Sequence, residues 1–193
     1  MLELVCATSN HGKLREFRLT TGPNISIAGS PAVDCPETGT TFEANALQKA
    51  LCYHQANPAA WLFADDSGLE VNVLEGAPGI HSARFAGPAA SDRENNMLLL
   101  RSLARVPPER RTARFVCTIA LLHDGRLAET FRGTVEGRIL RRHSGNRGFG
   151  YDPLFYYPPL RASFGHIPAH MKWQHSHRGH AFRAMLAWLR ENQ

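Results

Sequence analysis

The feature that most constrains the fold is a pair of long β-rich runs between residues 111 and 140, RTARFVCTIALLHDGRLAETFRGTVEGRIL. The segment His123-Asp124-Gly125-Arg126 separates them and is a strong turn signal, because Asp-Gly suits the backbone of a tight hairpin turn. This region therefore predicts a long antiparallel hairpin. A chain with such a hairpin needs a mixed sheet, because a purely parallel, doubly wound sheet has no place for it.

Strand and helix patterns alternate on both sides of this hairpin. Ser91 and Glu94 have the spacing of a capping box, which predicts a helix that ends near Pro107. Ser176 can cap a final helix. Hydrophobic periodicity predicts further strands over 2–7, 24–29, 61–64 and 69–74, and further helices over 12–19 and 41–54. We expect an α/β fold with a mixed β-sheet and flanking helices, built as one domain over residues 1–193.

The composition and the cysteines favour a soluble protein. Apolar residues make up 43% of the 193 residues, which is enough for a core without covalent links. The N-terminus lacks the basic region of a signal peptide, and no apolar run approaches the roughly 18 residues of a membrane span. Three of the four cysteines have apolar neighbours that suggest buried thiols: the four are Cys6, Cys35, Cys52 and Cys117. We expect a cytoplasmic protein with reduced cysteines and no membrane partner.

The net charge of +5 indicates an anionic partner. Many of the basic residues fall in two segments, 105–114 and 137–150. Positive potential of this kind attracts either nucleic acid or free phosphates, and the charge alone does not distinguish them.

The segment TSNHGK, residues 8–13, lies between the first predicted strand and its helix. Backbone N–H groups at such a junction can bind phosphate, and Lys13 can add a positive charge. The spacing differs from that of a Walker A loop. The simpler alternative is a polar turn with a solvated lysine.

The segment ADDSG places Asp65 and Asp66 directly after a predicted strand. Mg²⁺ prefers carboxylate oxygens, and a second carboxylate could take a proton from an attacking water. The alternative is an Asx turn, but two adjacent carboxylates repel each other and a cation would relieve that cost. The order D-D-S also differs from the D-x-D of aspartyl-phosphate phosphatases.

Two later segments are candidate binding elements. In GNRGFGYDPLF, residues 145–155, Phe149 and Tyr151 offer ring faces for a base, and Asp152 can accept hydrogen bonds. The alternative is a glycine-rich hairpin tip. His177 and Arg178 fall at the start of the last predicted helix and could donate to a phosphate or a purine carbonyl, or simply begin a surface helix.

Five segments together resemble the inosine triphosphate pyrophosphatase family, the Ham1-like nucleotide house-cleaning enzymes. In order, they are TSNHGKLREF, TTFEANALQKA, FADDSGLEVNVLEGAPGIHSARFAG, GFGYDPLF and KWQHSHRG, and the resemblance spans about residues 3–190. It implies hydrolysis of purine nucleoside triphosphates such as dITP, ITP and XTP to the monophosphate and pyrophosphate. It also implies Mg²⁺ as cofactor, two lobes around a central cleft, and a homodimer.

The resemblance also implies roles for individual residues. Asp66 would be the general base and a metal ligand, with Asp65 in support and Ser67 in contact with the substrate. The triphosphate would be held by Thr8, Ser9, Asn10, His11, Gly12 and Lys13. The base would be held by Phe149, Gly150, Tyr151 and Asp152, with Lys172, His177 and Arg178 completing the base and phosphate pocket.

The sequence departs from the family pattern around the metal. Pro36-Glu37 precedes Thr38-Gly39, and Ala44 replaces the glutamate usual before Asn45, so either Glu37 or Glu43 can supply the second metal ligand. His166 and His170 are four residues apart, which raises the alternative of a zinc site, although Pro168 between them disfavours a shared helix.

The main alternative from another functional class is an RNA- or nucleotide-binding protein that lacks catalytic activity. It is disfavoured because a polyanion binder has little use for Asp65 and Asp66, so we expect no nucleic-acid partner. A closer alternative is a nucleotide pyrophosphatase with a shifted base preference.

Overall fold

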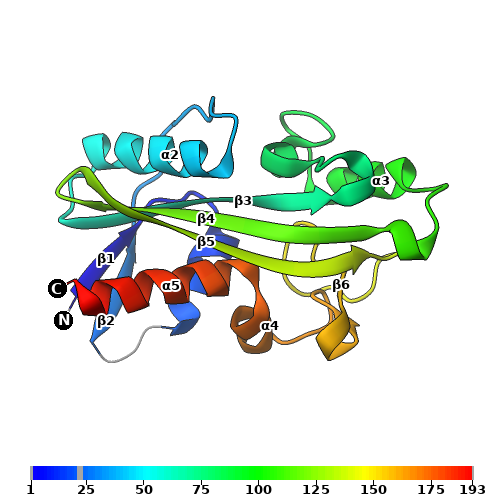
Figure 1. The fold of residues 1–193 in the computed structure, drawn as a ribbon. Helices are drawn as coiled ribbons and strands as arrows, with labels where there is room; N and C mark the ends of the chain where they lie inside the picture. The colour runs from blue at the N-terminus through cyan, green and yellow to red at the C-terminus, as the bar shows by residue number, and fades with distance from the viewer. Residues whose placement is uncertain (1, 21–23, 193) are drawn as a thin grey trace. The chain divides into compact units, whose positions relative to one another are not determined.

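The computed structural model describes residues 2–20 and 24–192, and within them it shows a mixed β-sheet with flanking helices (Figure 1). The strand order is β2-β1-β3-β4-β5-β6-β7. β1 pairs in parallel with β2 and β3, whereas β6 pairs antiparallel with β5 and β7. The strands are β1 (Leu2–Cys6), β2 (Ile25–Gly29), β3 (Trp61–Val71), β4 (Thr112–His123), β5 (Arg126–Ile139), β6 (Phe155–Tyr157) and β7 (Ala162–Ser163). The expected α/β class, the mixed sheet and the β4–β5 hairpin are confirmed.

Several helices begin where the sequence offers capping side chains. Thr41 accepts a hydrogen bond from the Ala44 N–H at 3.1 Å, and Ser91 and Glu94 form the predicted capping box. The α-helices are α1 (His11–Phe17), α2 (Phe42–Ala56), α3 (Asp92–Ser102), α4 (Ala169–His175) and α5 (His177–Glu191). Short 3-10 turns occupy Arg18–Thr20, Asn72–Leu74, Gly79–Arg84, Pro108–Arg110 and Pro158–Leu160. No helix in the described part of the chain is long and apolar enough to cross a membrane.

The chain forms two compact units, and β3, β4 and β5 contribute residues to both. The first unit contains the residues up to Asp66, Cys117–Gly133 and the residues from His177 onward. The second unit contains Ser67–Val116 and Thr134–Ser176. The single catalytic domain and the central cleft implied by the family resemblance stay predictions.

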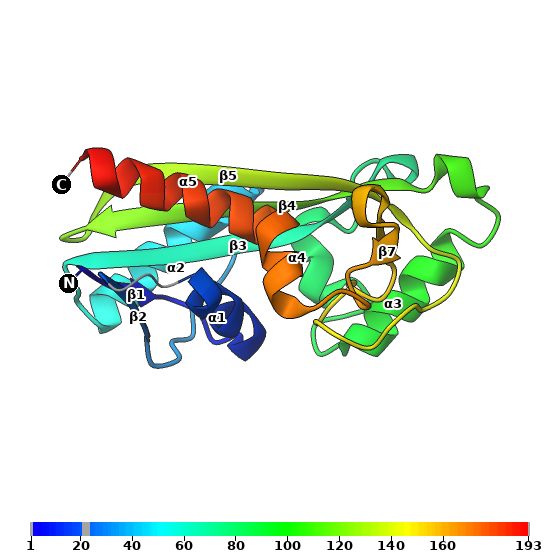
Figure 2. The same ribbon diagram turned by 90° about the horizontal axis from the view of Figure 1, so that it is seen from below.

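In the first unit, alternate side chains of β3 pack against different helices. Leu62 and Ala64 belong to a buried cluster that includes the apolar side chains of α2. Phe63, between them, packs against Phe17 of α1 and Phe182 of α5, with ring centroids 5.0 and 5.7 Å away. Figures 1 and 2 show the same division, with α2 on one side of the strands and α1 and α5 on the other. Because strand side chains alternate between faces, this pattern fixes the direction of the residues that follow.

The position of the two aspartates in β3 corrects the sequence-based prediction. Two short strands were expected, over 61–64 and 69–74, with Asp65 and Asp66 at the end of the first. Instead, β3 runs without interruption from Trp61 to Val71, and both aspartates lie in its middle. Ser67-Gly68 is a local turn signal, but burial of side chains on both sides of this strand outweighs it. The Asx-turn alternative is therefore wrong.

The second unit is held by an apolar core rich in aromatic rings. The rings of Phe115 and Phe155 lie 4.5 Å apart, and those of Phe155 and Phe164 lie 5.0 Å apart. Tyr151 joins this core, and its hydroxyl donates to the main-chain oxygen of Ser82 at 2.8 Å. The side chain of Tyr151 therefore anchors its own turn to the apolar core.

The cysteines only partly follow the prediction. Cys6 and Cys117 are buried free thiols, as expected, and burial raises the pKa of both far above that of an exposed thiol. Cys35 and Cys52, in contrast, form a disulfide across 17 residues of sequence. The expectation of reduced cysteines throughout is wrong for this pair, because only the fold brings them together.

Gly133 allows α5 to approach β5 closely. A Cβ atom at this position would collide with the main-chain oxygen of His177 and lie 2.5 Å from the nitrogen of Ala181. Both of these groups are backbone atoms of α5, so they cannot rotate away. The start of α5 therefore packs directly on the strand backbone.

Candidate functional site

Asp65 lies at the centre of a buried group of charges in the first unit. Lys13 Nζ is 2.9 Å from Asp65 Oδ2, and Arg178 Nε is 3.5 Å from the same oxygen. On its other side, the Arg178 guanidinium pairs with the buried carboxylate of Glu16 in α1. Positive and negative groups thus alternate from Lys13 through Asp65 and Arg178 to Glu16.

This arrangement keeps Asp65 ionised. Burial raises the pKa of its carboxyl, but the positive charges of Lys13, Arg178 and Lys49 outweigh burial and hold that pKa well below its usual range. A carboxylate that stays charged and is neutralised by buried cations is poorly suited to exchange protons near neutral pH. Asp65 is therefore a supporting residue that positions Lys13 and Arg178.

Asp66 faces the other side of β3, toward α2. Its Oδ2 accepts a hydrogen bond from Asn45 Nδ2 at 3.1 Å, and Asn45 Oδ1 accepts one from the Gly39 N–H at 2.8 Å. Burial raises the pKa of Asp66; Lys13 and Lys49 oppose this shift, the nearby negative charge of Glu37 adds to it, and the net direction is upward. A partly desolvated carboxylate with a raised pKa has the properties of a general base.

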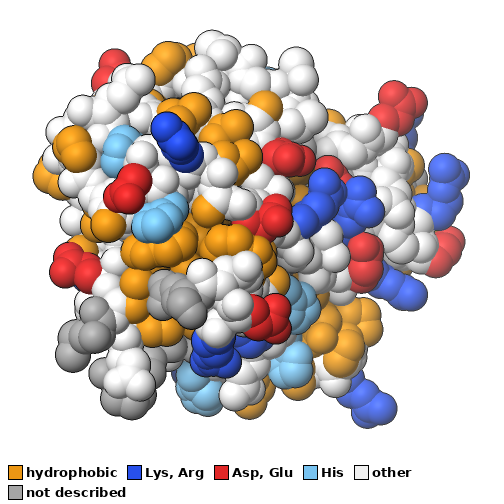
Figure 3. All heavy atoms as spheres, turned by 60° about the vertical axis from the view of Figure 1, so that its left-hand side comes forward, with side chains coloured by type: hydrophobic (Ala, Val, Ile, Leu, Met, Phe, Trp, Pro, Cys, Tyr) orange, Lys and Arg blue, Asp and Glu red, His pale blue; other side chains and the backbone are white. Residues whose placement is uncertain are grey.

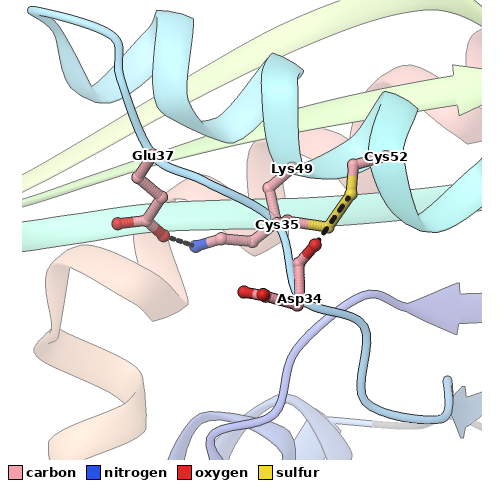
Figure 4. Close-up of a disulfide and its surroundings, with 5 residues drawn as sticks. All are labelled: Asp34, Cys35, Glu37, Lys49 and Cys52. Atoms are coloured by element: carbon pink, nitrogen blue, oxygen red, sulfur yellow. Dashed lines mark hydrogen bonds and ion pairs between the residues drawn. A yellow bond between two sulfur atoms is a disulfide. The ribbon is translucent and has the colours of Figure 1, made fainter.

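Lys49 connects Glu37 to the site around Asp65 and Asp66. Its Nζ lies 2.5 Å from Glu37 Oε1 (Figure 4). The same Nζ donates to the main-chain oxygen of Asp65 at 3.1 Å. Glu37 influences Asp66 electrostatically, whereas Glu43 is exposed in the first turn of α2. Of the two glutamates left open by the sequence, the geometry favours Glu37 as the partner of Asp66.

The segment from Thr8 to Lys13 lies at the junction between β1 and α1, as predicted. Its polar side chains mostly order the segment itself. Asn10 Oδ1 accepts from the Lys13 N–H at 3.1 Å and caps α1, while Thr8 Oγ1 accepts from the Asn10 N–H at 3.1 Å. Ser9 and His11 are exposed, and Gly12 is half-buried. Their predicted contacts with a triphosphate stay predictions.

The predicted base-binding residues form a second group, in the second unit. Lys172 Nζ lies 2.5 Å from Asp152 Oδ2 and 4.7 Å from the centre of the Phe149 ring. Asp152 also accepts from the Phe149 N–H at 2.9 Å, and the Gly150 N–H donates to Asp92 at 2.6 Å. This group joins a half-buried ring, a buried cation and a buried carboxylate.

Tyr151 has a different environment from the one expected. The sequence suggested that its ring offers a face to a base, but the ring is buried in the apolar core and its hydroxyl is bonded to Ser82. Phe149 is only half-buried. Stacking on a base therefore stays a prediction for Phe149 alone, and Tyr151 supports the turn.

The sequence-predicted residues thus fall into two groups. Lys13, Asp65, Asp66, Glu37 and Arg178 come together in the first unit, where His177 also lies buried at the start of α5. The second unit contains Ser67, Phe149, Gly150, Tyr151, Asp152 and Lys172.

Three residues of the first unit were not predicted from the sequence. Asn45 and Lys49 are four residues apart and share one face of α2, a spacing that could have indicated a common role. Glu16 carried no comparable signal, because its partner Arg178 lies at the far end of the sequence.

The acidic and histidine side chains also bear on metal binding. Among the residues that the structure describes, no group of three or more His, Cys, Asp or Glu side chains could hold a metal ion. α4 begins only after Pro168, so His166 and His170 do not share a helix, and the zinc hypothesis is not supported. Mg²⁺ remains compatible, because it commonly takes only one or two protein carboxylates together with substrate phosphates. Asp66 and Glu37 fit that requirement.

The surface charges are mixed on the face that Figure 3 shows. Lys and Arg side chains lie beside Asp and Glu side chains, and hydrophobic and histidine side chains gather between them. A protein that tracks a nucleic-acid backbone usually presents a continuous basic groove. This face has no such feature, and the absence of a nucleic-acid partner stays a prediction.

Comparison with known proteins identifies the family. A model of the Ham1 family matches residues 4–188. The chain belongs to the Ham1 family. A relative from Desulforamulus reducens, named dITP/XTP pyrophosphatase, is 44% identical over 97% of this chain and 96% of its own length. A relative with the same name from Acidobacterium capsulatum is 42% identical over 97% of this chain and 98% of its own length.

A solved Ham1 structure supports the same assignment. The Ham1 protein of Staphylococcus aureus superimposes with a TM-score of 0.85 at 39% identity, over 99% of this chain and all of that chain. The strand order and the helices around the sheet are thus features of the Ham1 family, and the family resemblance expected from the sequence is confirmed.

Proposed function

We propose that this chain is a Mg²⁺-dependent nucleoside triphosphate pyrophosphatase that converts dITP, ITP and XTP to the monophosphate and pyrophosphate. The observation that carries the proposal is the division of labour between Asp65 and Asp66. One carboxylate is neutralised by Lys13 and Arg178, and the other has a raised pKa and faces α2. The names of the relatives, dITP/XTP pyrophosphatase, support the choice of substrate.

Asp66 and Glu37 are the residues that would hold Mg²⁺. The negative charge of Glu37 helps to raise the pKa of Asp66, and a cation between such carboxylates is favourable because it removes their repulsion. When bound, Mg²⁺ would neutralise phosphate charge and polarise the phosphoryl group. Lys49 neutralises Glu37 in the structure. A cation held by Glu37 would replace Lys49 in that role, and Lys49 could then reorganise toward substrate phosphate.

Proton transfer and charge stabilisation fall to different side chains. Asp66 takes the proton from the water that attacks the α-phosphorus, and its raised pKa makes it a stronger base than an exposed aspartate. Lys13 stabilises the negative charge that develops on the pyrophosphate as it leaves. Asp65 holds the Lys13 ammonium in place for this role.

The second unit would select the base. Phe149 would stack on the purine, and Lys172, held between Asp152 and the Phe149 ring, would donate to the keto oxygen at position 6. An adenine amino group presents a donor at that position, so Lys172 would lose its acceptor. His177 and Arg178 would contribute further donors, as the family resemblance implies.

The decisive experiment measures products from a panel of nucleotides. The protein is incubated with Mg²⁺ and dITP, XTP, dGTP, dATP or dUTP, and pyrophosphate and orthophosphate are quantified separately. We expect pyrophosphate from dITP and XTP, and its loss in Asp66→Asn. The matched control is Glu43→Gln, because Glu43 is an exposed carboxylate at the start of α2. Orthophosphate as the first product, or full activity in Asp66→Asn, would contradict the mechanism.

Two further properties follow from the family resemblance. We propose that the protein is a homodimer and that it acts in the cytoplasm, where nucleotide pools are cleansed. Light scattering coupled to size-exclusion chromatography tests the first point, with a mass near twice 21.4 kDa as the expected result. Fractionation of the source cells tests the second.

A further inference from the structure

The connection between β2 and α2 runs along one side of α2 and carries Glu37. Residues 30–41 contain neither helix nor strand, so side-chain contacts must hold them in place. Their partners on α2 are Asn45, Gln48, Lys49 and Cys52. These positions follow the spacing of a single helix face.

The contacts form a register in which the connection runs antiparallel to α2. Gly39 N donates to Asn45 Oδ1 at 2.8 Å, and Thr38 N donates to Gln48 Oε1 at 3.1 Å. Farther along α2, Glu37 pairs with Lys49 and Cys35 is bonded to Cys52 (Figure 4). The disulfide is the covalent link in this register, and the other links are hydrogen bonds or an ion pair.

Glu37 therefore lies between two kinds of anchor. On its C-terminal side, two hydrogen bonds attach Thr38 and Gly39 to α2. On its N-terminal side, Cys35 is attached by the disulfide, while Asp34 and Pro36 are exposed. If the disulfide opens, the backbone on the N-terminal side of Glu37 loses its covalent link to the helix and keeps the apolar packing of Val33 and Cys35 against the cluster that includes α2.

We propose that the Cys35–Cys52 disulfide is a redox-controlled tether that positions Glu37 for the divalent cation, so that reduction weakens Mg²⁺ binding. The inference rests on the proposed function, which makes Glu37 a metal ligand. Cys35 and Cys52 are positioning residues here, because they act through Glu37. Both cysteines are half-buried, so a small dithiol can reach the bond. Disulfides in cytosolic proteins are commonly transient and redox-sensing.

The chemical step is a thiol–disulfide exchange with a dithiol. One thiolate of the dithiol attacks a sulfur of the pair and displaces the other cysteine as a thiolate, and the second thiol then resolves the mixed disulfide. Cys35 and Cys52 gain two electrons and two protons in total, and the dithiol becomes a cyclic disulfide. No other group of the protein changes its oxidation state.

The test compares Mg²⁺ binding by the oxidised and reduced forms of the same protein. Calorimetry measures the binding of Mg²⁺ alone to the protein, and dithiothreitol is the reductant. Because positioning groups around a metal ligand commonly change metal affinity by 10- to 100-fold, we expect a dissociation constant roughly 10-fold higher after reduction. Amide hydrogen exchange at Thr38 and Gly39 is expected to accelerate in the reduced form.

The double variant Cys35→Ser/Cys52→Ser is the matched control. It should bind Mg²⁺ like the reduced protein and be insensitive to dithiothreitol, because Cys6 and Cys117 are buried and remain unchanged. Equal Mg²⁺ affinity in the oxidised and reduced forms would overturn the proposal, as would a thiol count that shows no disulfide after mild oxidation. Activity is read separately: if neither form cleaves dITP, the proposed function fails, whereas the binding comparison still decides the tether.

Discussion

Asp65 and Asp66 are neighbours in the chain, but their carboxylates lie on opposite faces of β3. Asp65 follows the direction of Phe63 and meets Lys13 and Arg178, whereas Asp66 follows Ala64 and meets Asn45. Strand geometry alone causes this separation. It lets two identical side chains take opposite pKa shifts, one downward and one upward.

The first prediction concerns stability in acid. Because the pKa of folded Asp65 lies below its unfolded value of about 3.9, the unfolded chain binds more protons as the pH falls. The stabilisation from Asp65 is therefore complete above about pH 4 and is lost progressively below it. Urea unfolding between pH 7 and pH 2.5 measures this loss. Asp65→Asn should be less stable at pH 7 and show a flatter pH dependence below pH 4; parallel curves for the two proteins would contradict the prediction.

The second prediction concerns Glu16. Glu16→Gln removes the carboxylate that pairs with the buried Arg178 guanidinium, and breaking one side of a buried pair typically costs about 3–5 kcal/mol. We expect the lower end of this range, because Arg178 keeps Asp65 as a partner. Chemical unfolding measures the change. Glu43→Gln removes an exposed carboxylate and should change stability by less than about 0.5 kcal/mol; equal stability of the two variants would show that the buried pair is not structural.

The third prediction concerns base stacking by Phe149. Phe149→Ala should raise KM for dITP by roughly 5- to 150-fold, because base–aromatic stacking contributes about 1–3 kcal/mol. kcat should change much less, since Asp66 and Lys13 lie in the first unit. Tyr156→Ala is the control, because Tyr156 is a half-buried aromatic side chain of β6 outside the predicted site. If both substitutions change KM alike, Phe149 has no special contact with the base.

The fourth prediction concerns the contribution of the disulfide to stability. Linking two cysteines across a loop of this length restricts the unfolded chain, so reduction should lower the free energy of unfolding by about 3 kcal/mol. Urea unfolding with and without dithiothreitol measures the difference. The Cys35→Ser/Cys52→Ser protein should show no effect of dithiothreitol, and any effect there would point to Cys6 or Cys117 instead.

Local sequence patterns predicted the elements of the fold well where the signal lay within one element. The capping box at Ser91 and Glu94 and the Asp124-Gly125 turn are both present. Ser67-Gly68 misled the prediction of β3, because a local turn signal was weaker than pairing and burial on both sides of the strand.

The candidate site was predictable only in part, for a related reason. Lys13, Asp66 and Glu37 could be predicted because their charged side chains suit phosphate or metal binding, and the family resemblance implied a role for each. Asn45, Glu16 and the Cys35–Cys52 bond gain their roles from partners distant in the chain. Tyr151 shows the converse: an aromatic residue beside glycines suggested a ligand contact, but the fold uses its ring as core.

Gly133 has no reactive side chain, but the fold depends on it. Since any side chain there would strike the backbone of α5, even alanine would push the start of that helix away from β5. His177 and Arg178 would move with it, and the ion pairs of Arg178 with Glu16 and Asp65 would be lost. In a complete mutational scan, position 133 should therefore tolerate as few replacements as Asp65 and Asp66.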